Sequence, residues 1–311
     1  MRPRAVVRAL RAGRRGDAAP ADALRAALPG LPALSRRRPP PVRHVPGGPT
    51  LMLSPHLDDA VFSCWSTLTG PGEVTVVNVF TALPPAGVRA SWDAITGFED
   101  SRAGMRRRLA EDREALALAG RVPVNLGLVD RQYRRRAPSL SDLLAALAQH
   151  APVAGQVVAP AGIGGQSDHR LVREACLELA RGGMPVTLYA DVPYAVRLGW
   201  PDWVTGTRAV PHLSADAWWG PYLEAVPAAE FSLVSRVERL SGEAAAAKLA
   251  AMRTYRTQYP ALSGGPADVL AHPEILGYEV AWAVVPHGAR TAVAPGWSRE
   301  EPAPADMAVV R

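Results

Sequence analysis

The sequence is poor in cysteine and has no long apolar run. Its two cysteines, Cys64 and Cys176, lie far apart and outside any Cys-x-x-Cys pair. This excludes a zinc finger or a dithiol redox motif and predicts two buried thiols in a reducing compartment. No stretch approaches the roughly 20 apolar residues that span a membrane. Residues 5–7 are apolar but Arg8 follows at once, so the apolar segment of a secretory signal is missing. We therefore expect a cytoplasmic protein with no membrane partner.

Lysine is nearly absent, since Lys248 is the sole lysine among 35 basic residues. The formal net charge of +6 comes from arginine clusters at residues 2–15, 36–38, 106–108 and 134–136, a usage typical of GC-rich coding sequence. No RNA-binding aromatic motif or basic zipper accompanies the charge, so we do not expect a nucleic-acid partner. A basic interaction protein that binds nucleic acid or an anionic surface is therefore only a third hypothesis.

The composition changes near residue 49. Residues 1–48 are rich in Arg, Pro and Ala, and the three prolines at residues 39–41 close a linker within them. We therefore interpret residues 1–48 as a basic N-terminal arm. The rest, residues 49–311, is long enough for one domain with a sizeable core.

Strand-like and helix-like segments alternate within this domain. The apolar, β-branched segments predict strands at residues 51–53, 74–81, 122–128, 156–159 and 185–190. Helical periodicity predicts helices at residues 60–68, 101–119, 140–149, 168–180 and 243–259, and residues 278–285 are a strand or a short helix. The alternation predicts an α/β, Rossmann-like, mostly parallel sheet flanked by helices. The tryptophans at residues 200–219 are either an aromatic cap over the core or a wall of a substrate pocket.

Polar residues gather where the predicted strands end. They are residues 54–59, Thr81, Asp130, residues 164–169 and residues 191–194. Because the carboxyl ends of parallel strands form the ligand crevice of such a sheet, these segments are expected to meet at one edge.

His56 and Asp59 lie three residues apart on a turn into a helix, and His169 comes from the fourth strand connection. Three nitrogen and oxygen ligands with one open position describe a catalytic zinc, which activates water and polarises a carbonyl. A second carboxylate must accept the water proton, and Asp58 fits. The competing interpretation is that Asp58 or Asp59, and Ser167 or Asp168, only cap helices.

Ser-Pro-His-Leu-Asp-Asp at residues 54–59 and Gly-Gly-Gln-Ser-Asp-His at residues 164–169 resemble the PIG-L/LmbE-like zinc-dependent N-acetyl-sugar deacetylases. The resemblance covers about residues 50–285, with support from residues 108–112, 126–130, 189–194 and 248–258. It implies one zinc, or another divalent metal, on His56, Asp59 and His169, with Asp58 as the general base. Asp191 and Tyr194 are expected to bind substrate.

The sequence departs from the family pattern at three positions. Leu57 and Ala60 interrupt the usual His-Pro-Asp-Asp-Glu and are read as tolerated variation. Gln166 replaces the first histidine of His-x-Asp-His. A glutamine amide can donate a hydrogen bond to an oxyanion but cannot titrate. Gln166 and Asp168 therefore stay candidate catalytic residues, although Asp168 loses the histidine that it orients in the family.

The leaving amine then needs another proton donor, for which Asp58 is favoured over His212 and His272. The leading hypothesis is a metal-dependent amidohydrolase that removes an N-acetyl or N-acyl group from an amino sugar or glycosylated metabolite in bacterial secondary metabolism. The alternative is a relative that keeps the metal but has lost or altered hydrolysis, and acts by binding a ligand or in a different step. The sequence does not predict the oligomeric state.

Overall fold

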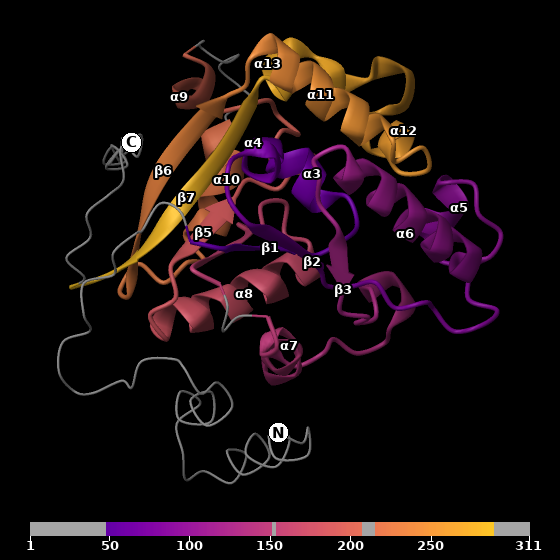
Figure 1. Ribbon diagram of the computed structural model, residues 1–311, viewed down its shortest axis with the longest axis horizontal. Helices are drawn as coiled ribbons and strands as arrows, with labels where there is room; N and C mark the ends of the chain where they lie inside the picture. The colour runs from indigo at the N-terminus through magenta and orange to yellow at the C-terminus, as the bar shows by residue number, and fades with distance from the viewer. Residues whose placement is uncertain (1–47, 151–153, 207–214, 289–311) are drawn as a thin grey trace, which may run out of the picture.

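The computed structural model describes residues 48–150, 154–206 and 215–288. The predicted N-terminal arm therefore lies outside the described residues, except for Gly48. Within the described part the chain forms a seven-stranded sheet in the order β3-β2-β1-β4-β5-β7-β6 (Figure 1). Strands β1 to β5 run parallel, β7 is antiparallel to β5, and β6 is antiparallel to β7. The predicted α/β, Rossmann-like, mostly parallel sheet is confirmed.

The strands are β1 (Thr50–Ser54), β2 (Val74–Asn78), β3 (Pro123–Asn125), β4 (Gln156–Pro160), β5 (Val186–Tyr189), β6 (Phe231–Arg239) and β7 (Tyr278–Pro286). The helices are α3 (Asp59–Ser63), α4 (Trp65–Thr69), α5 (Ser91–Ile95), α6 (Ser101–Ala117), α7 (Leu140–Leu147), α8 (Ser167–Arg181), α9 (Asp202–Thr205), α10 (Ala215–Leu223), α11 (Gly242–Arg253), α12 (Tyr259–Leu262) and α13 (Pro273–Leu276). None of the helices in the described ranges is long and apolar enough to cross a bilayer.

Helices cover both faces of the sheet. Figure 1 shows α7 and α8 on one face and α3, α6 and α11 on the other. All five residues of β1 are buried, as expected for a central parallel strand that is covered on both sides. In α8 the residues Val172, Ala175, Cys176 and Leu179 are buried, so one apolar stripe of the helix packs on the sheet. Cys64 and Cys176 are buried free thiols, as predicted.

The predicted helix at residues 60–68 is interrupted at Cys64, where α3 ends and α4 begins. The cause is a contact distant in sequence. The Glu279 carboxylate on β7 accepts hydrogen bonds from the backbone nitrogens of Trp65 (2.7 Å) and Ser66 (3.0 Å), and so satisfies the amino end of α4. Lys248 Nζ donates to the same carboxylate at 2.8 Å.

Other elements also differ from the prediction in their boundaries. The predicted helix at residues 243–259 ends at Arg253, and residues 278–285 belong to a strand, not a helix. Strands β2 and β3 are shorter than predicted, and β6 was not predicted at all.

Candidate metal centre and pocket

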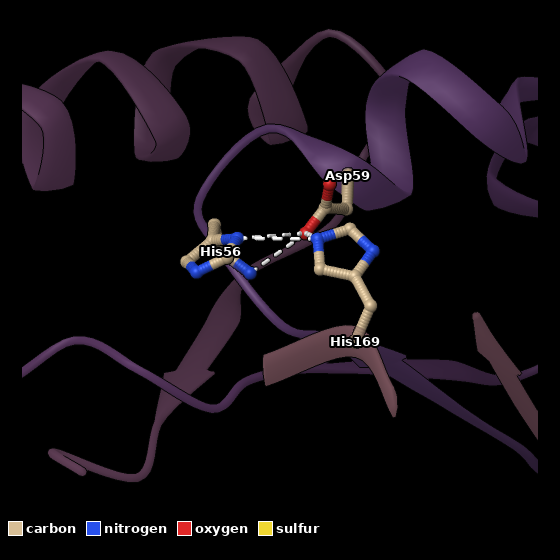
Figure 2. Close-up of side chains that lie close together, drawn as sticks. All are labelled: His56, Asp59 and His169. Atoms are coloured by element: carbon tan, nitrogen blue, oxygen red, sulfur yellow. Dashed lines mark hydrogen bonds and ion pairs between the residues drawn. The ribbon is translucent and has the colours of Figure 1, made fainter. Parts of the chain in front are cut away.

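Three side chains converge on one point near the carboxyl end of β1 (Figure 2). His56 and Asp59 lie where β1 leads into α3, and His169 lies in the first turn of α8. Nδ1 of His56 is 3.5 Å and Nε2 of His169 is 3.3 Å from Oδ2 of Asp59, and the two nitrogens are 3.2 Å apart. In a zinc tetrahedron with bonds of about 2.0–2.1 Å, ligand atoms are about 3.3–3.4 Å apart. The donor atoms and their spacing therefore fit a zinc-sized cation.

Local hydrogen bonds fix the turn between β1 and α3. Ser54 Oγ donates to the carbonyl of His56 (2.6 Å) and accepts from the backbone nitrogen of Ala60 (3.1 Å). The backbone nitrogen of His56 donates to Asp59 Oδ2 at 2.7 Å. Asp58 stands at the N-cap position of α3 but makes no capping hydrogen bond with its side chain. Capping therefore does not explain the two aspartates, because Asp59 contacts His56 and Asp58 lines the pocket.

Asp191 contacts His169, the candidate ligand histidine of α8. Its Oδ1 lies 2.6 Å from Nδ1 of His169, and its Oδ2 accepts a hydrogen bond from the backbone nitrogen of Ile163 at 2.9 Å. Such a contact fixes the tautomer that leaves Nε2 free to bind a metal. Asp191 is fully buried and is not among the residues that line the pocket. The structure therefore places Asp191 behind His169 and not in the pocket wall, and its role in binding substrate stays a prediction.

Asp168 contacts His56 from behind, as Asp191 contacts His169. Its Oδ2 lies 3.3 Å from Nε2 of His56, and the Arg131 backbone nitrogen (3.0 Å) and the Arg134 guanidinium also donate to its carboxylate. His56, Asp130 and Asp168 form a second group of potential metal ligands. However, the positive charge of Arg134 already neutralises Asp168, so we assign this group no metal.

The candidate ligands His56, Asp59 and His169 lie in a strongly negative electrostatic environment. Burial alone would lower the pKa of His169, but the negative charges of Asp59 and Asp191 outweigh it and raise this pKa to about 9. The pKa of Asp59 is lowered although burial opposes this, because both histidines favour its charged form. The group therefore stabilises positive charge, and a metal would have to displace the proton of His169.

Gln166 is the N-cap residue of α8. Its Oε1 accepts hydrogen bonds from the backbone nitrogens of Asp168 and His169. The interpretation that Ser167 or Asp168 caps this helix is therefore wrong. Because the helix nitrogens require the carbonyl oxygen, the amide nitrogen faces the site and lies 3.3 Å from Nε2 of His56.

The ligand group opens into a cavity of about 460 Å³. Asp58 and Gln166 line it beside the ligands His56 and Asp59, and so does Tyr194. Burial and the neighbouring charge of Asp59 raise the pKa of Asp58. This direction favours a general base, because it moves the carboxylate toward the pH at which it must exchange protons.

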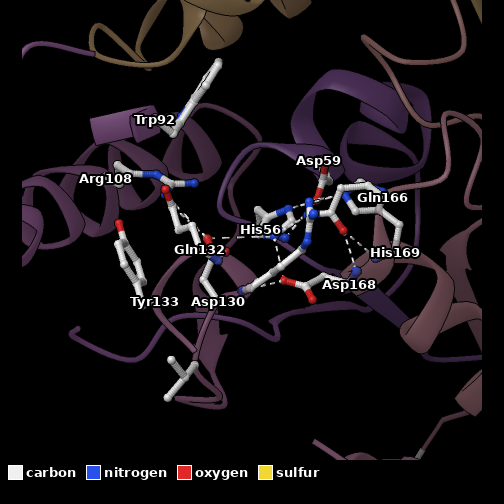
Figure 3. Close-up of polar contacts among 12 residues, drawn as sticks. His56, Asp59, Trp92, Arg108, Asp130, Gln132, Tyr133, Gln166, Asp168 and His169 are labelled. Carbon is white, nitrogen blue, oxygen red and sulfur yellow. Dashed lines mark hydrogen bonds and ion pairs between the residues drawn. The ribbon is translucent and has the colours of Figure 1, made fainter. Parts of the chain in front are cut away.

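The outer part of the pocket is lined by Arg108, Asp130 and Gln258, which the sequence analysis had included in its motifs, and by Trp92 and Gln132, which it had not (Figure 3). Trp92 on α5 donates its indole N–H to Gln258 Oε1 at 2.7 Å and so joins two distant segments. Arg108 on α6 is 4% exposed, and its Nε and Nη1 have no hydrogen-bond partner within the described residues. Asp130 and Gln132 complete this polar wall. The motif at residues 108–112 had marked Arg108, but no local pattern distinguishes Trp92 or Gln132.

Two other expectations concern distant residues. His272 is exposed beside Glu274 (3.3 Å) and does not line the pocket, a position that favours Asp58 over His272 as the proton donor. His212 lies outside the described residues. Trp200 and Trp219 are buried, pack edge to face at 5.8 Å and do not line the pocket, which supports the interpretation as an aromatic cap.

Comparisons with known proteins point to deacetylases. No family model matches the chain. A curated relative, 2'-N-acetylparomamine deacetylase of Streptomyces fradiae, is 33% identical over 166 residues, which cover 48% of this chain and 58% of the relative. The match therefore spans less than two thirds of that protein. A triple mutant of a deacetylase from the teicoplanin biosynthetic pathway superimposes with a TM-score of 0.58 and 26% identity over 77% of this chain and 99% of that chain. The A40926 pseudoaglycone deacetylase superimposes with a TM-score of 0.56 and 26% identity over 76% of this chain and 97% of that chain. The chain is thus similar to deacetylases in sequence and in fold.

Proposed function

We propose that this chain is a zinc-dependent N-deacetylase that hydrolyses the N-acetyl or N-acyl amide of an amino sugar or glycosylated metabolite in secondary metabolism. One observation carries the proposal. His56, Asp59 and His169 place three donor atoms at tetrahedral spacing beside a fourth polar group, Asp58, at the base of a cavity. The sequence and fold similarity to deacetylases supports the choice of an amide as the bond that is cleaved.

The residues of the chain divide the reaction between them. A zinc ion held by the three ligands would supply Lewis acidity for the addition of water to the acyl carbonyl. Asp58 accepts the proton that the water loses and then gives it to the amine nitrogen as the carbon–nitrogen bond breaks. The products are a carboxylate and a free amine. Asp191 and Asp168 hold the two histidines in orientation.

The pocket wall suits a hydroxylated ring. Arg108 offers donors, Asp130 offers acceptors, and Gln132 and Gln258 bring both kinds of group. The ring of Trp92 adds an apolar surface at the outer end. A saturated sugar ring has polar edges and apolar faces, so this mixture supports an amino-sugar substrate over a purely apolar amide.

The test measures primary-amine release from N-acetylated aminoglycosides and from N-acylated glucosamine units of glycopeptides, with zinc-loaded protein. Asp58→Asn should keep its zinc and lose about a hundredfold or more in kcat, because an amide cannot accept the proton. Asp112→Asn, a buried carboxylate outside the pocket, is the matched control and should retain turnover. Near-normal turnover in Asp58→Asn would refute the assigned base.

The capping role of Gln166 supports a second candidate function. Because Gln166 caps α8, its presence in the site is explained without a catalytic role. This agrees with a protein that keeps its metal and binds a sugar without cleaving it. Zinc and sugar binding without amine release from any substrate would favour this candidate.

A further inference from the structure

Tyr194 presents a free phenol beside the candidate metal centre. It lines the same cavity as Asp58 and Asp59, and its ring meets that of His169 edge-on, with centroids 5.5 Å apart and an interplanar angle of 88°. Its hydroxyl has no hydrogen-bond partner within residues 48–150, 154–206 and 215–288.

The loop that carries Tyr194 is held by two indoles. Trp218 Nε1 donates to the carbonyl of Tyr194 at 3.1 Å, and Trp219 Nε1 donates to the carbonyl of Ala195 at 2.8 Å. Trp219 is itself buried in the aromatic cap. The backbone of Tyr194 is therefore fixed by the core, as a preorganised hydrogen-bond donor requires.

The opposite loop makes room for this side chain. Gly164 has a φ of +90°, and a Cβ added there would lie 2.6 Å from Cβ of Tyr194. Glycine is thus required at position 164 both by its backbone conformation and by the closeness of the tyrosine. Gly164 and Tyr194 fit together, and this contact holds the ring against His169.

The amide nitrogen of Gln166 lies near the His56 ring nitrogen that is not part of the candidate ligand group. This ring nitrogen is Nε2, whereas Nδ1 of His56 is the atom that faces Asp59 and His169. The ring of Tyr194 instead contacts His169, whose Nε2 belongs to the ligand group.

We infer that Tyr194 is a catalytic residue whose hydroxyl donates a hydrogen bond to the acyl oxygen as that oxygen becomes negative in the tetrahedral intermediate. This rests on the proposed function. When water adds, the carbonyl π electrons move to the oxygen, and the phenol keeps its own proton throughout. The hydrogen bond weakens again when the carbon–nitrogen bond breaks and the carbonyl re-forms. Tyr194 thus supplies an oxyanion contact on the His169 side of the site, whereas the Gln166 amide lies beside Nε2 of His56.

The test compares Tyr194→Phe with Tyr222→Phe in amine release by the zinc-loaded protein. Phenylalanine keeps the ring contact with His169, so zinc content and KM should change little while kcat falls about ten- to a thousandfold. Binding of a phosphonate analogue of the tetrahedral intermediate should weaken in parallel. Tyr222 packs near Gly165 but does not line the cavity, so Tyr222→Phe should behave as wild type. Gly164→Ala, which displaces Tyr194, should also lower kcat.

Three results would overturn the inference. An unchanged kcat with a raised KM would leave Tyr194 as a substrate contact only. Loss of zinc in Tyr194→Phe would show a structural role. A kcat equal to that of wild type would exclude any catalytic role. Wild-type protein that binds zinc but releases no amine would instead refute the proposed function, and with it the inference.

Discussion

The support that Asp191 gives to His169 leads to a quantitative prediction for metal affinity. Oδ1 of Asp191 contacts Nδ1 of His169 at 2.6 Å, and Oδ2 accepts from the backbone nitrogen of Ile163 at 2.9 Å. In Asp191→Asn only one side-chain atom can accept, so either the histidine or the amide of Ile163 must face an NH2 group. Loss of such a supporting contact weakens metal binding about ten- to a hundredfold, which corresponds to about 1.4–2.7 kcal/mol.

The assay is competition for zinc between the protein and a chromophoric chelator at one fixed pH. Asp112→Asn is the control, because Asp112 is equally buried and hydrogen-bonded but lies outside the ligand group. Zinc affinity in Asp191→Asn equal to that of wild type would refute the reasoning. Equal weakening in both variants would assign the effect to general destabilisation.

Three further predictions concern stability and organisation. Lys248→Met leaves the carboxylate of Glu279 buried and without its cation, so the free energy of unfolding in urea should fall by about 3–5 kcal/mol. The control is the half-exposed ion pair of Arg256 with Glu114. Arg256→Met should change the free energy of unfolding by less than about 1 kcal/mol. A loss of similar size in both variants would contradict this. Burial raises the pKa of Asp112 to about 8, so the folded protein keeps a proton that the unfolded chain releases above about pH 4. The stability of wild type relative to Asp112→Asn should therefore fall as pH rises from about 4 to 8, and parallel pH curves would show that Asp112 is not protonated. Deleting residues 1–40 should leave zinc binding and thermal unfolding unchanged, since β1 begins at Thr50; aggregation would place the arm in the core.

The sequence predicted the parts of the fold whose signal is local and apolar. Strands β1 and β4 and helix α8 are buried stretches with the expected periodicity, so their positions agree with the structure to within one or two residues. The meeting of His56 and His169 was predictable for the same reason. Once the strands are parallel, the segments after β1 and β4 must share an edge of the sheet.

Contacts between distant segments explain most of the errors. The break at Cys64 depends on Glu279, which lies 214 residues from Trp65, and no local pattern reveals it. The helix that begins at Gly242 ends at Arg253, and the residues after it make contacts distant in sequence, Thr257 with Glu111 and Gln258 with Trp92.

Strand β6 escaped prediction because, among the residues that the structure describes, it pairs on one side only, with β7. Of its nine residues only Phe231 and Val234 are buried. An edge strand of this kind has little apolar signal.

The direction of each side chain was the least predictable feature of the site. Asp191 follows β5 as expected, but only the structure shows that it faces His169 and not the pocket. At the start of α8, Ser167 and Asp168 have the stronger capping propensity. Arg134 and His56 engage the carboxylate of Asp168, and Gln166 caps the helix instead.

The most direct test of the central claim is a titration of metal-free protein with zinc while amine release from an N-acetylated amino sugar that the wild-type protein cleaves is followed. Turnover should be absent without metal and should rise in proportion to added zinc until one equivalent per chain is bound. His169→Ala should show neither the binding nor the rise, because it removes one of the three ligands that we assign. Full turnover in the presence of excess chelator, or zinc binding that His169→Ala leaves unchanged, would contradict a zinc-dependent deacetylase built on His56, Asp59 and His169.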